Sequence, residues 1–231
     1  MNILCSICAR SGSKGLSNKN ILKINRKPLI SHTFLQAKKS KIFTCITLST
    51  DSNKIIDIAK QHKIDFIIKR SKKLSHDSAD KTSAIIDLLK QTEKEYKLKF
   101  DIIVDLDVTA PLRKISDIKK SISYFNKKNS TNLITVTESR KNPYFNMIEF
   151  SGNKVKLVSC KLNNKYKTRQ SAPRVYEVTP SIFIWKRDYL MKSKKIISDK
   201  TCIYELPYER SIDIDSKNDF KYVEYLMKKN L

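Results

Sequence analysis

Short apolar runs alternate with amphipathic stretches along the first two-thirds of the chain. The runs are too apolar for strands with one wet face, whereas residues 82–96 repeat Ile85, Ile86, Leu88 and Leu89 at helical spacing. Strands are expected at residues 3–8, 45–49, 65–68, 102–106 and 133–136, and helices at residues 29–39, 52–62, 82–96 and 116–125. This alternation predicts an α/β fold, a mostly parallel sheet with helices on both faces.

In such a sheet, ligands bind beyond the carboxyl ends of the strands. The loops after Cys8, Ser49, Ile68 and Leu106 are therefore expected to line the functional site.

The pattern changes between about residues 138 and 176. Two short apolar runs, 147–150 and 154–158, flank the turn sequence Ser151-Gly152-Asn153 and predict a hairpin. Strand character returns at 181–185 and 203–206, and a helix is expected at 217–228. We interpret residues 1–231 as a single domain with an inserted arm at about 138–176.

Composition adds a strong positive charge to this picture. The chain has 231 residues, of which 40% are hydrophobic, and a net charge of +24. The lysines are spread along the whole sequence and form no stripe with interleaved aromatic residues, so we expect no nucleic-acid surface. A basic nucleic-acid-binding module remains the alternative from a different functional class.

Targeting signals and cysteines bear on the compartment. No apolar run approaches the roughly 18–20 residues of a membrane span, and the first residues lack the order typical of a signal peptide. Five scattered cysteines argue against a disulfide framework. We therefore expect a soluble cytoplasmic protein without a membrane partner.

The loop after the first strand is the main candidate for chemistry. Residues 9–16 (A-R-S-G-S-K-G-L) combine two of the three glycines in the chain with a hydroxyl and two cations. Glycine lets backbone N–H groups approach phosphate oxygens, and Arg and Lys neutralise their charge. The segment fits neither the Walker pattern nor G-x-G-x-x-G, and composition alone permits a phosphate cradle or an ordinary surface turn.

The order of residues 9–16, followed by Lys19-Asn20, resembles the first motif of the acylneuraminate cytidylyltransferases. Three further segments resemble motifs of that family in the same order. They are 106–113 (L-D-V-T-A-P-L-R, against L-Q-P-T-S-P-L-R), 169–173 (R-Q-S-A-P) and 211–215 (S-I-D-I-D). The related Kdo cytidylyltransferases lack the Lys14-Gly15 and Lys19-Asn20 pairings, so a CMP-Kdo synthetase is the alternative within the same class.

The resemblance implies a Rossmann-like nucleotidyltransferase fold and a reaction in which a sugar's anomeric hydroxyl attacks the α-phosphorus of CTP. It implies catalytic roles for Arg10, Lys14, Lys19 and Asp215, and a nucleotide site formed by Ala9, Arg10, Ser13, Lys14, Lys19, Asn20, Arg70 and Asp77. Without the resemblance, the better interpretation of Arg70 is that it is one of the solvated charges in residues 69–73.

For the acidic nine-carbon sugar, the resemblance implies contacts from Asp107, Arg169, Gln170, Thr179 and Phe183, with Arg169 facing the sugar's carboxylate. Asp107 stands where the family usually has Gln, and residues 177–180 (E-V-T-P) replace a segment that often contains Pro-Asn-Gly. The sequence of residues 106–113 resembles that of legionaminate-type members more than that of members that use N-acetylneuraminate. The family also usually dimerises, so a homodimer is expected, with the arm crossing to the partner.

Asp213 and Asp215 are the expected ligands of Mg²⁺. On a strand, residues two apart face the same side, and two carboxylates with nucleotide phosphates suit this hard cation. The alternative is a pair of helix-capping acids, because Ser216 and the final helix follow.

Overall fold

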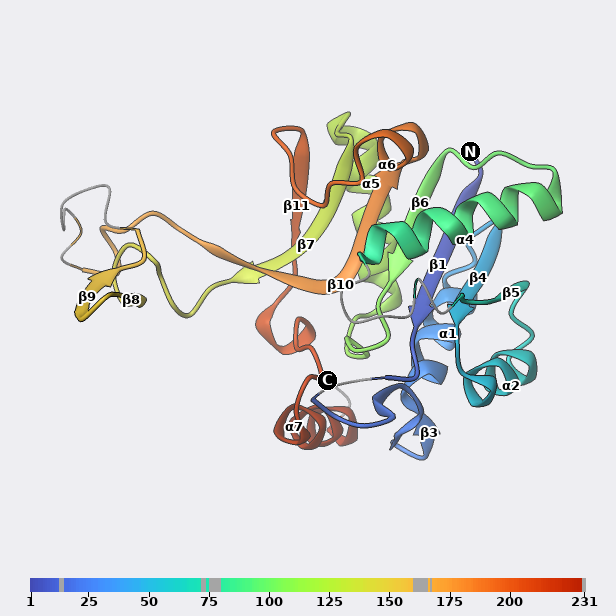
Figure 1. Ribbon diagram of the computed structural model, residues 1–231, viewed down its shortest axis with the longest axis horizontal. Helices are drawn as coiled ribbons and strands as arrows, with labels where there is room; N and C mark the ends of the chain where they lie inside the picture. The colour runs from blue at the N-terminus through green and yellow to red at the C-terminus, as the bar shows by residue number, and fades with distance from the viewer. Residues whose placement is uncertain (13–14, 72–73, 75–79, 160–165, 167, 230–231) are drawn as a thin grey trace.

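A seven-stranded sheet forms the centre of the computed structural model, which describes residues 1–12, 15–71, 74, 80–159, 166 and 168–229 (Figure 1). The strands lie in the order β11-β7-β10-β6-β1-β4-β5. They comprise β1 (Ile3–Ala9), β4 (Cys45–Thr50), β5 (Phe66–Lys69), β6 (Ile102–Leu106), β7 (Asn132–Glu138), β10 (Tyr176–Lys186) and β11 (Thr201–Glu205). Only β10 runs antiparallel to its neighbours within this sheet, so the prediction of a mostly parallel sheet is confirmed.

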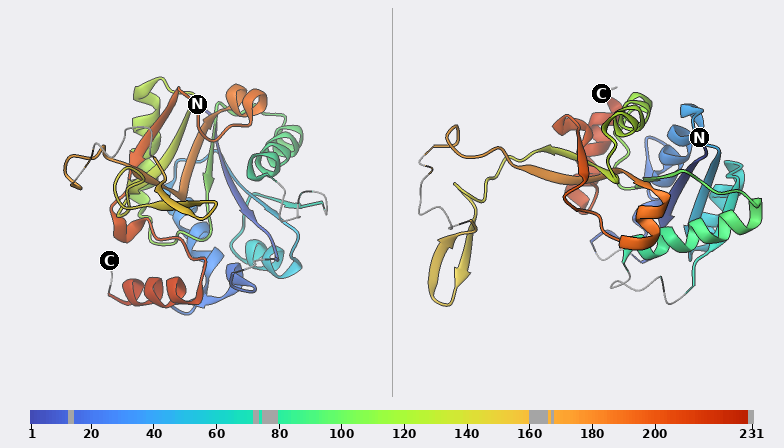
Figure 2. Two further views of the ribbon diagram at one scale, coloured as in Figure 1. Left: turned by 60° about the vertical axis from the view of Figure 1, so that its left-hand side comes forward. Right: turned by 90° about the horizontal axis from the view of Figure 1, so that it is seen from above.

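Helices cover both faces of this sheet, as the pattern predicted (Figures 1 and 2). They are α1 (Leu29–Ser40), α2 (Asn53–Gln61), α4 (Lys81–Tyr96), α5 (Ile115–Lys128), α6 (Arg187–Ser193) and α7 (Lys217–Lys228). Alternate residues of β1 supply the two cores: Cys5 belongs to the core that contains residues of α1, α2, α5 and α7, and Leu4 to the core that contains residues of α4 and α6. Short elements complete the body: the 3₁₀ turns Lys19–Ile21 and Tyr208–Arg210, and the paired strands β2 (Lys23–Ile24) and β3 (Lys27–Pro28).

Local sequence determines where the helices begin. Ser52 caps α2 by accepting from the backbone N–H of Ile55, and Asp80 caps α4 by accepting from that of Thr82. These caps fix the first turn of each helix next to the carboxyl edge of the sheet, where the predicted site lies.

The inserted arm begins where the pairing of β7 with β10 ends, at Glu138 opposite Tyr176. It carries a separate two-stranded sheet of β8 (Ile148–Ser151) and β9 (Lys154–Leu157), joined at Gly152, which adopts φ +61°. Figures 1 and 2 show this hairpin projecting away from the helices and the main sheet. Within the described part of the chain, no helix combines the length and apolar character needed to cross a membrane.

Candidate active site

The carboxyl ends of four adjacent parallel strands, β5, β4, β1 and β6, lie at one edge of the sheet. The residues that follow these strands include Arg10, Asp51, Arg70 and Asp107. The structure therefore brings four separate sequence segments to the edge at which ligands bind in such folds.

The loop after β1 is held from two sides. Asp51 accepts hydrogen bonds from the backbone N–H and the hydroxyl of Ser11, at 2.7 and 2.8 Å. The buried amide of Asn20 donates to the carbonyl of Arg10 at 3.0 Å. Asn20 thus fixes the backbone that follows Ala9, which is the last residue of β1. The expected phosphate ligands Ser13 and Lys14 lie outside the described residues.

Lys19 connects this loop to the segment with the two aspartates. Its ammonium donates to the carbonyl of Ile214 at 2.6 Å and pairs with Asp215 Oδ1 at 2.8 Å. Gly15 approaches the same segment so closely that an added Cβ would lie 2.3 Å from the carbonyl oxygen of Asp215. Position 15 therefore requires glycine for packing, a reason that the sequence interpretation did not include.

Arg70 is buried, and the alternative that it is a solvated surface charge is wrong. Its Nε donates to the Ser49 hydroxyl and its Nη2 to the Ser49 carbonyl, both at 3.0 Å. These bonds hold the guanidinium at the end of β4, on the ligand-binding edge. Asp77 lies outside the described residues.

Asp213 and Asp215 lie in a loop, not on a strand as the spacing predicted. The segment is nevertheless anchored, because the N–H of Ile214 bonds to the carbonyl of Thr109 at 2.9 Å and the Ile214 side chain is fully buried. Among the described residues, the backbone of this loop pairs with Thr109 in the loop after β6 and not with a strand of the sheet.

The capping alternative for these two acids is wrong as well. Ser216 is the N-cap of α7, and its hydroxyl accepts from the N–H of Asp219 at 3.2 Å. In the second bond of this capping box, the Asp219 carboxylate accepts from the Ser216 N–H at 2.7 Å. The helix start is thus satisfied without the side chains of Asp213 and Asp215.

Asp213 has the properties of a cation ligand. Its Oδ1 atom is buried and has no hydrogen-bond partner among the described residues. Burial, with smaller contributions from the charges of Asp107 and Asp215, raises the pKa of Asp213 to about 6, although a bond from Thr109 opposes this. A divalent cation would satisfy the orphaned oxygen and favour the ionised form.

No set of three His, Cys, Asp or Glu side chains in the described ranges could hold a metal ion by itself. A cation at Asp213 and Asp215 would therefore need phosphate and water oxygens to complete its shell. Mg²⁺ is typically bound in this way, through one or two carboxylates together with substrate phosphates. The residues present fit that ion.

Lys81 is a site residue that the sequence interpretation missed. Its ammonium pairs with Asp105 Oδ2 at 2.8 Å and Asp107 Oδ2 at 2.7 Å, and lies 4.6 Å from the centre of the Phe183 ring. Lys81 is the first residue of α4, where the helix dipole disfavours a cation. A lysine at the start of a helix is therefore the one signal in the sequence that could have identified Lys81 as a site residue.

The match to a family model decides the family. A model described as "Cytidylyltransferase" matches residues 4–227. The chain belongs to the cytidylyltransferase family. Post-translational flagellin modification protein B of Campylobacter coli is 44% identical over 99% of this chain and 97% of its own. CMP-N,N'-diacetyllegionaminic acid synthase of Campylobacter jejuni is 43% identical over the same shares.

Solved structures confirm the nucleotidyltransferase fold of this cytidylyltransferase. CMP:2-keto-3-deoxy-manno-octonic acid synthetase, in complex with CTP, superposes with a TM-score of 0.74 over the full length of both chains. Since the two sequences are only 16% identical, the likeness shows the fold alone.

The predicted sugar-binding residues of the cytidylyltransferase lie in two places. Phe183 is buried beneath the ammonium of Lys81 and stacks on Trp185, and Thr179 is buried beside Thr135. Arg169 and Gln170 are exposed in the arm, where Arg169 donates to the carbonyl of Arg140 at 3.2 Å. The structure thus gathers Asp107 and Phe183 near Lys81, but it leaves Arg169 and Gln170 on the arm.

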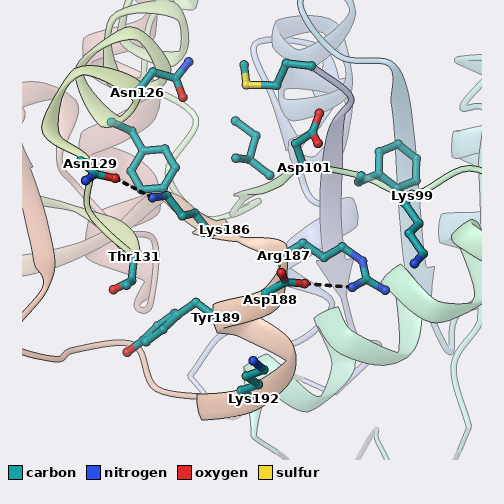
Figure 3. A pocket seen from close by; sticks show the side chains of 14 residues that line it. Lys99, Asp101, Asn126, Asn129, Thr131, Lys186, Arg187, Asp188, Tyr189 and Lys192 are labelled. Atoms are coloured by element: carbon teal, nitrogen blue, oxygen red, sulfur yellow. Dashed lines mark hydrogen bonds and ion pairs between the residues drawn. The ribbon is translucent and has the colours of Figure 1, made fainter.

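A cavity of about 790 Å³ opens at the opposite, amino-terminal edge of the strands (Figure 3). Two of its cations are already engaged, since Lys186 donates to Asn129 at 3.0 Å and Arg187 pairs with Glu93 at 2.7 Å and Asp188 at 3.2 Å. Neither Lys19 nor Asp215 lines it, so it belongs to a different part of the cytidylyltransferase.

Proposed function

We propose that this cytidylyltransferase couples CTP to an acidic nine-carbon 2-keto sugar of the legionaminic type, giving the CMP-sugar and pyrophosphate. The contact of Lys19 with Ile214 and Asp215 carries the proposal, because it joins a glycine-containing cationic loop to a pair of carboxylates. The 43% identity to CMP-N,N'-diacetyllegionaminic acid synthase supports the choice of sugar. The Kdo alternative has only the common fold in its favour, at 16% identity.

The chemistry is a substitution at phosphorus. The anomeric oxygen of the sugar forms a bond to the α-phosphorus of CTP, the bond from that phosphorus to the bridging oxygen breaks, and pyrophosphate leaves with the bonding pair. The hydroxyl proton passes to a base, for which Asp215 is the candidate. Arg10 and Lys19, together with Lys14, neutralise the phosphate charge, and such positioned charges provide most of the catalysis in phosphoryl-type transfers.

Asp213 and Asp215 would hold Mg²⁺, which supplies charge neutralisation at the α-phosphate when bound. The buried Oδ1 of Asp213, which has no hydrogen-bond partner among the described residues, supports this assignment.

We expect pyrophosphate release to require CTP and to be far slower with ATP or GTP. The physical reason is that Arg70, fixed by Ser49, lies at the edge where a base would be read. The measurement is pyrophosphate release with each nucleotide against legionaminate, neuraminate, pseudaminate and Kdo. Equal rates with all three nucleotides, or no release with any of the sugars, would contradict the proposed function.

We also propose that the enzyme acts as a homodimer in which the arm contacts the partner. Ile148, Phe150, Val155 and Leu157 lie on one face of the hairpin, and the first three are 62%, 80% and 55% exposed. Such an uncovered apolar sheet face favours a protein partner. Contact through the arm would also place Arg169 and Gln170, which are exposed on the arm, near the partner.

The dimer proposal predicts that Phe150→Glu shifts the protein towards monomer, because a charge would enter the apolar contact. Sedimentation velocity over a range of concentrations measures this shift. Ser151→Glu, which adds the same charge to the opposite face of the hairpin, is the matched control and should sediment like the parent. A parent protein that is monomeric at all concentrations would rule the dimer out.

A further inference from the structure

Two carboxylates lie close together at the point where β6 ends. Asp105 and Asp107 are two residues apart at the carboxyl end of this strand, and Asp105 is almost completely buried. Asp105 accepts from the Ser6 hydroxyl at 2.8 Å, and the ammonium of Lys81 bridges both carboxylates at 2.8 and 2.7 Å. Without Lys81, two like charges would share a desolvated site, an arrangement that proteins avoid.

Asp107 is the more exposed of the two carboxylates that Lys81 bridges. Its Oδ1 accepts from the N–H and the hydroxyl of Thr109, at 3.2 and 3.0 Å, and its Oδ2 accepts from Lys81. An ionised carboxylate offers about four acceptor positions. Among the described residues three are used, so Oδ2 retains one, and the side chain is 20% exposed.

The ion pairs shift the pKa values of Lys81 and Asp107 so that both side chains stay charged. Burial alone would lower the pKa of Lys81, but Asp105 and Asp107 outweigh it and hold that pKa well above its ordinary value. Burial would likewise raise the pKa of Asp107, but the charge and hydrogen bond of Lys81 hold it below its ordinary value. Lys81 therefore stays charged and Asp107 stays ionised at neutral pH.

The remaining acceptor position lies next to the reaction site. Thr109, which fixes Asp107, also holds the Asp213 segment through its bond to the N–H of Ile214 at 2.9 Å. Asp107 is close enough to Asp213 for their charges to interact. The proposed function assigns the nucleotide phosphates to Arg10 and Lys19 and the sugar to Asp107.

We propose that Lys81 is a positioning residue, which holds Asp107 as a fixed, ionised acceptor for a neutral hydrogen-bond donor of the sugar, a hydroxyl or an amide N–H. The inference rests on the proposed function and concerns its specificity. Asp can only accept, whereas the Gln common in the related family can also donate. The ionised Asp107 also repels the sugar's carboxylate, which must bind elsewhere.

The test is steady-state kinetics of Lys81→Met, with the concentrations of CTP and of N,N'-diacetyllegionaminic acid varied separately. Met keeps the length of the side chain but removes the charge, so Asp107 loses its anchor. We expect the KM for the sugar to rise about tenfold or more, the scale of one charge-assisted hydrogen bond, and the KM for CTP to stay essentially unchanged. Lys81→Arg should restore most of the affinity for the sugar.

Two further variants separate this role from a merely structural one. Lys90→Met changes an exposed lysine on the same helix and should leave both KM values unchanged. Asp107→Asn should raise the KM for the sugar, and adding it to Lys81→Met should cost little more, because both changes remove one contact.

An unchanged KM for the sugar in Lys81→Met would overturn the inference, whatever happens to its melting temperature. Equal rises in both KM values would do the same, and an altered magnesium dependence with normal sugar affinity would assign Asp107 to the metal instead. Failure of the proposed function has a different signature, since the unmodified enzyme would then release no pyrophosphate with this or the other three sugars.

Discussion

Replacing Lys19 with alanine is expected to lower kcat by roughly 100-fold or more, the scale for the loss of one preorganised charge stabiliser. Lys19 contacts the Asp213–Asp215 segment directly, through the carbonyl of Ile214 and Asp215 Oδ1. Its loss would remove a positive charge from the phosphate side and release Asp215 from its ion pair.

The fold should tolerate this change, because the contacts of Lys19 are polar and lie at the edge of the site. Lys23→Ala is the matched control, since Lys23 is an exposed lysine on β2 only four residues later. The measurement is kcat for both variants at saturating CTP and sugar, together with their melting temperatures. Near-normal turnover of the Lys19 variant would remove this residue from the catalytic set.

Periodicity predicted the parallel part of the sheet well because local residues determine it. The strands at β1, β4 and β6 begin where their apolar runs begin, and Ser52 marks the start of α2. The position of β10 was not predictable in this way. It inserts antiparallel between β6 and β7, and its first residues pair with Glu138 and Thr137, so both its length and its direction depend on a strand about forty residues away.

The candidate site shows the same division. The family resemblance identified Lys19, Arg70, Asp107 and the two late aspartates, and the structure places all five at or beside the carboxyl edge of the sheet. Lys81 was missed because it is one of 47 Lys and Arg residues, and its meaning comes from two carboxylates more than twenty positions away. The strand proposed for Asp213 and Asp215 was wrong because Ile214 bonds to a loop residue, Thr109, which no local pattern specifies.

Asp213→Asn and Asp215→Asn are each expected to lower kcat by roughly 100-fold or more and to shift its dependence on magnesium to higher concentrations. Asparagine keeps the shape of the side chain but lacks the negative charge that a hard cation requires. The effect at Asp213 follows from its buried Oδ1, which has no partner among the described residues, and the effect at Asp215 from its place beside Lys19. The measurement is kcat against magnesium concentration for the parent and both variants.

The double variant and a neighbouring acid make this prediction specific to a shared ion. If Asp213 and Asp215 act on one cation, the double variant should cost much less than the product of the two single effects, because the second change removes a ligand from a site already lost. Asp219→Asn is the control: the oxygen of asparagine can still accept the bonds that cap α7 through Ser216, so the change removes only a neighbouring negative charge and should leave the magnesium curve in place. Magnesium curves that are unchanged in both single variants would limit these aspartates to a structural role. A shifted curve in Asp219→Asn alone would show instead that the start of the helix, and not the pair of acids, governs the response to the metal.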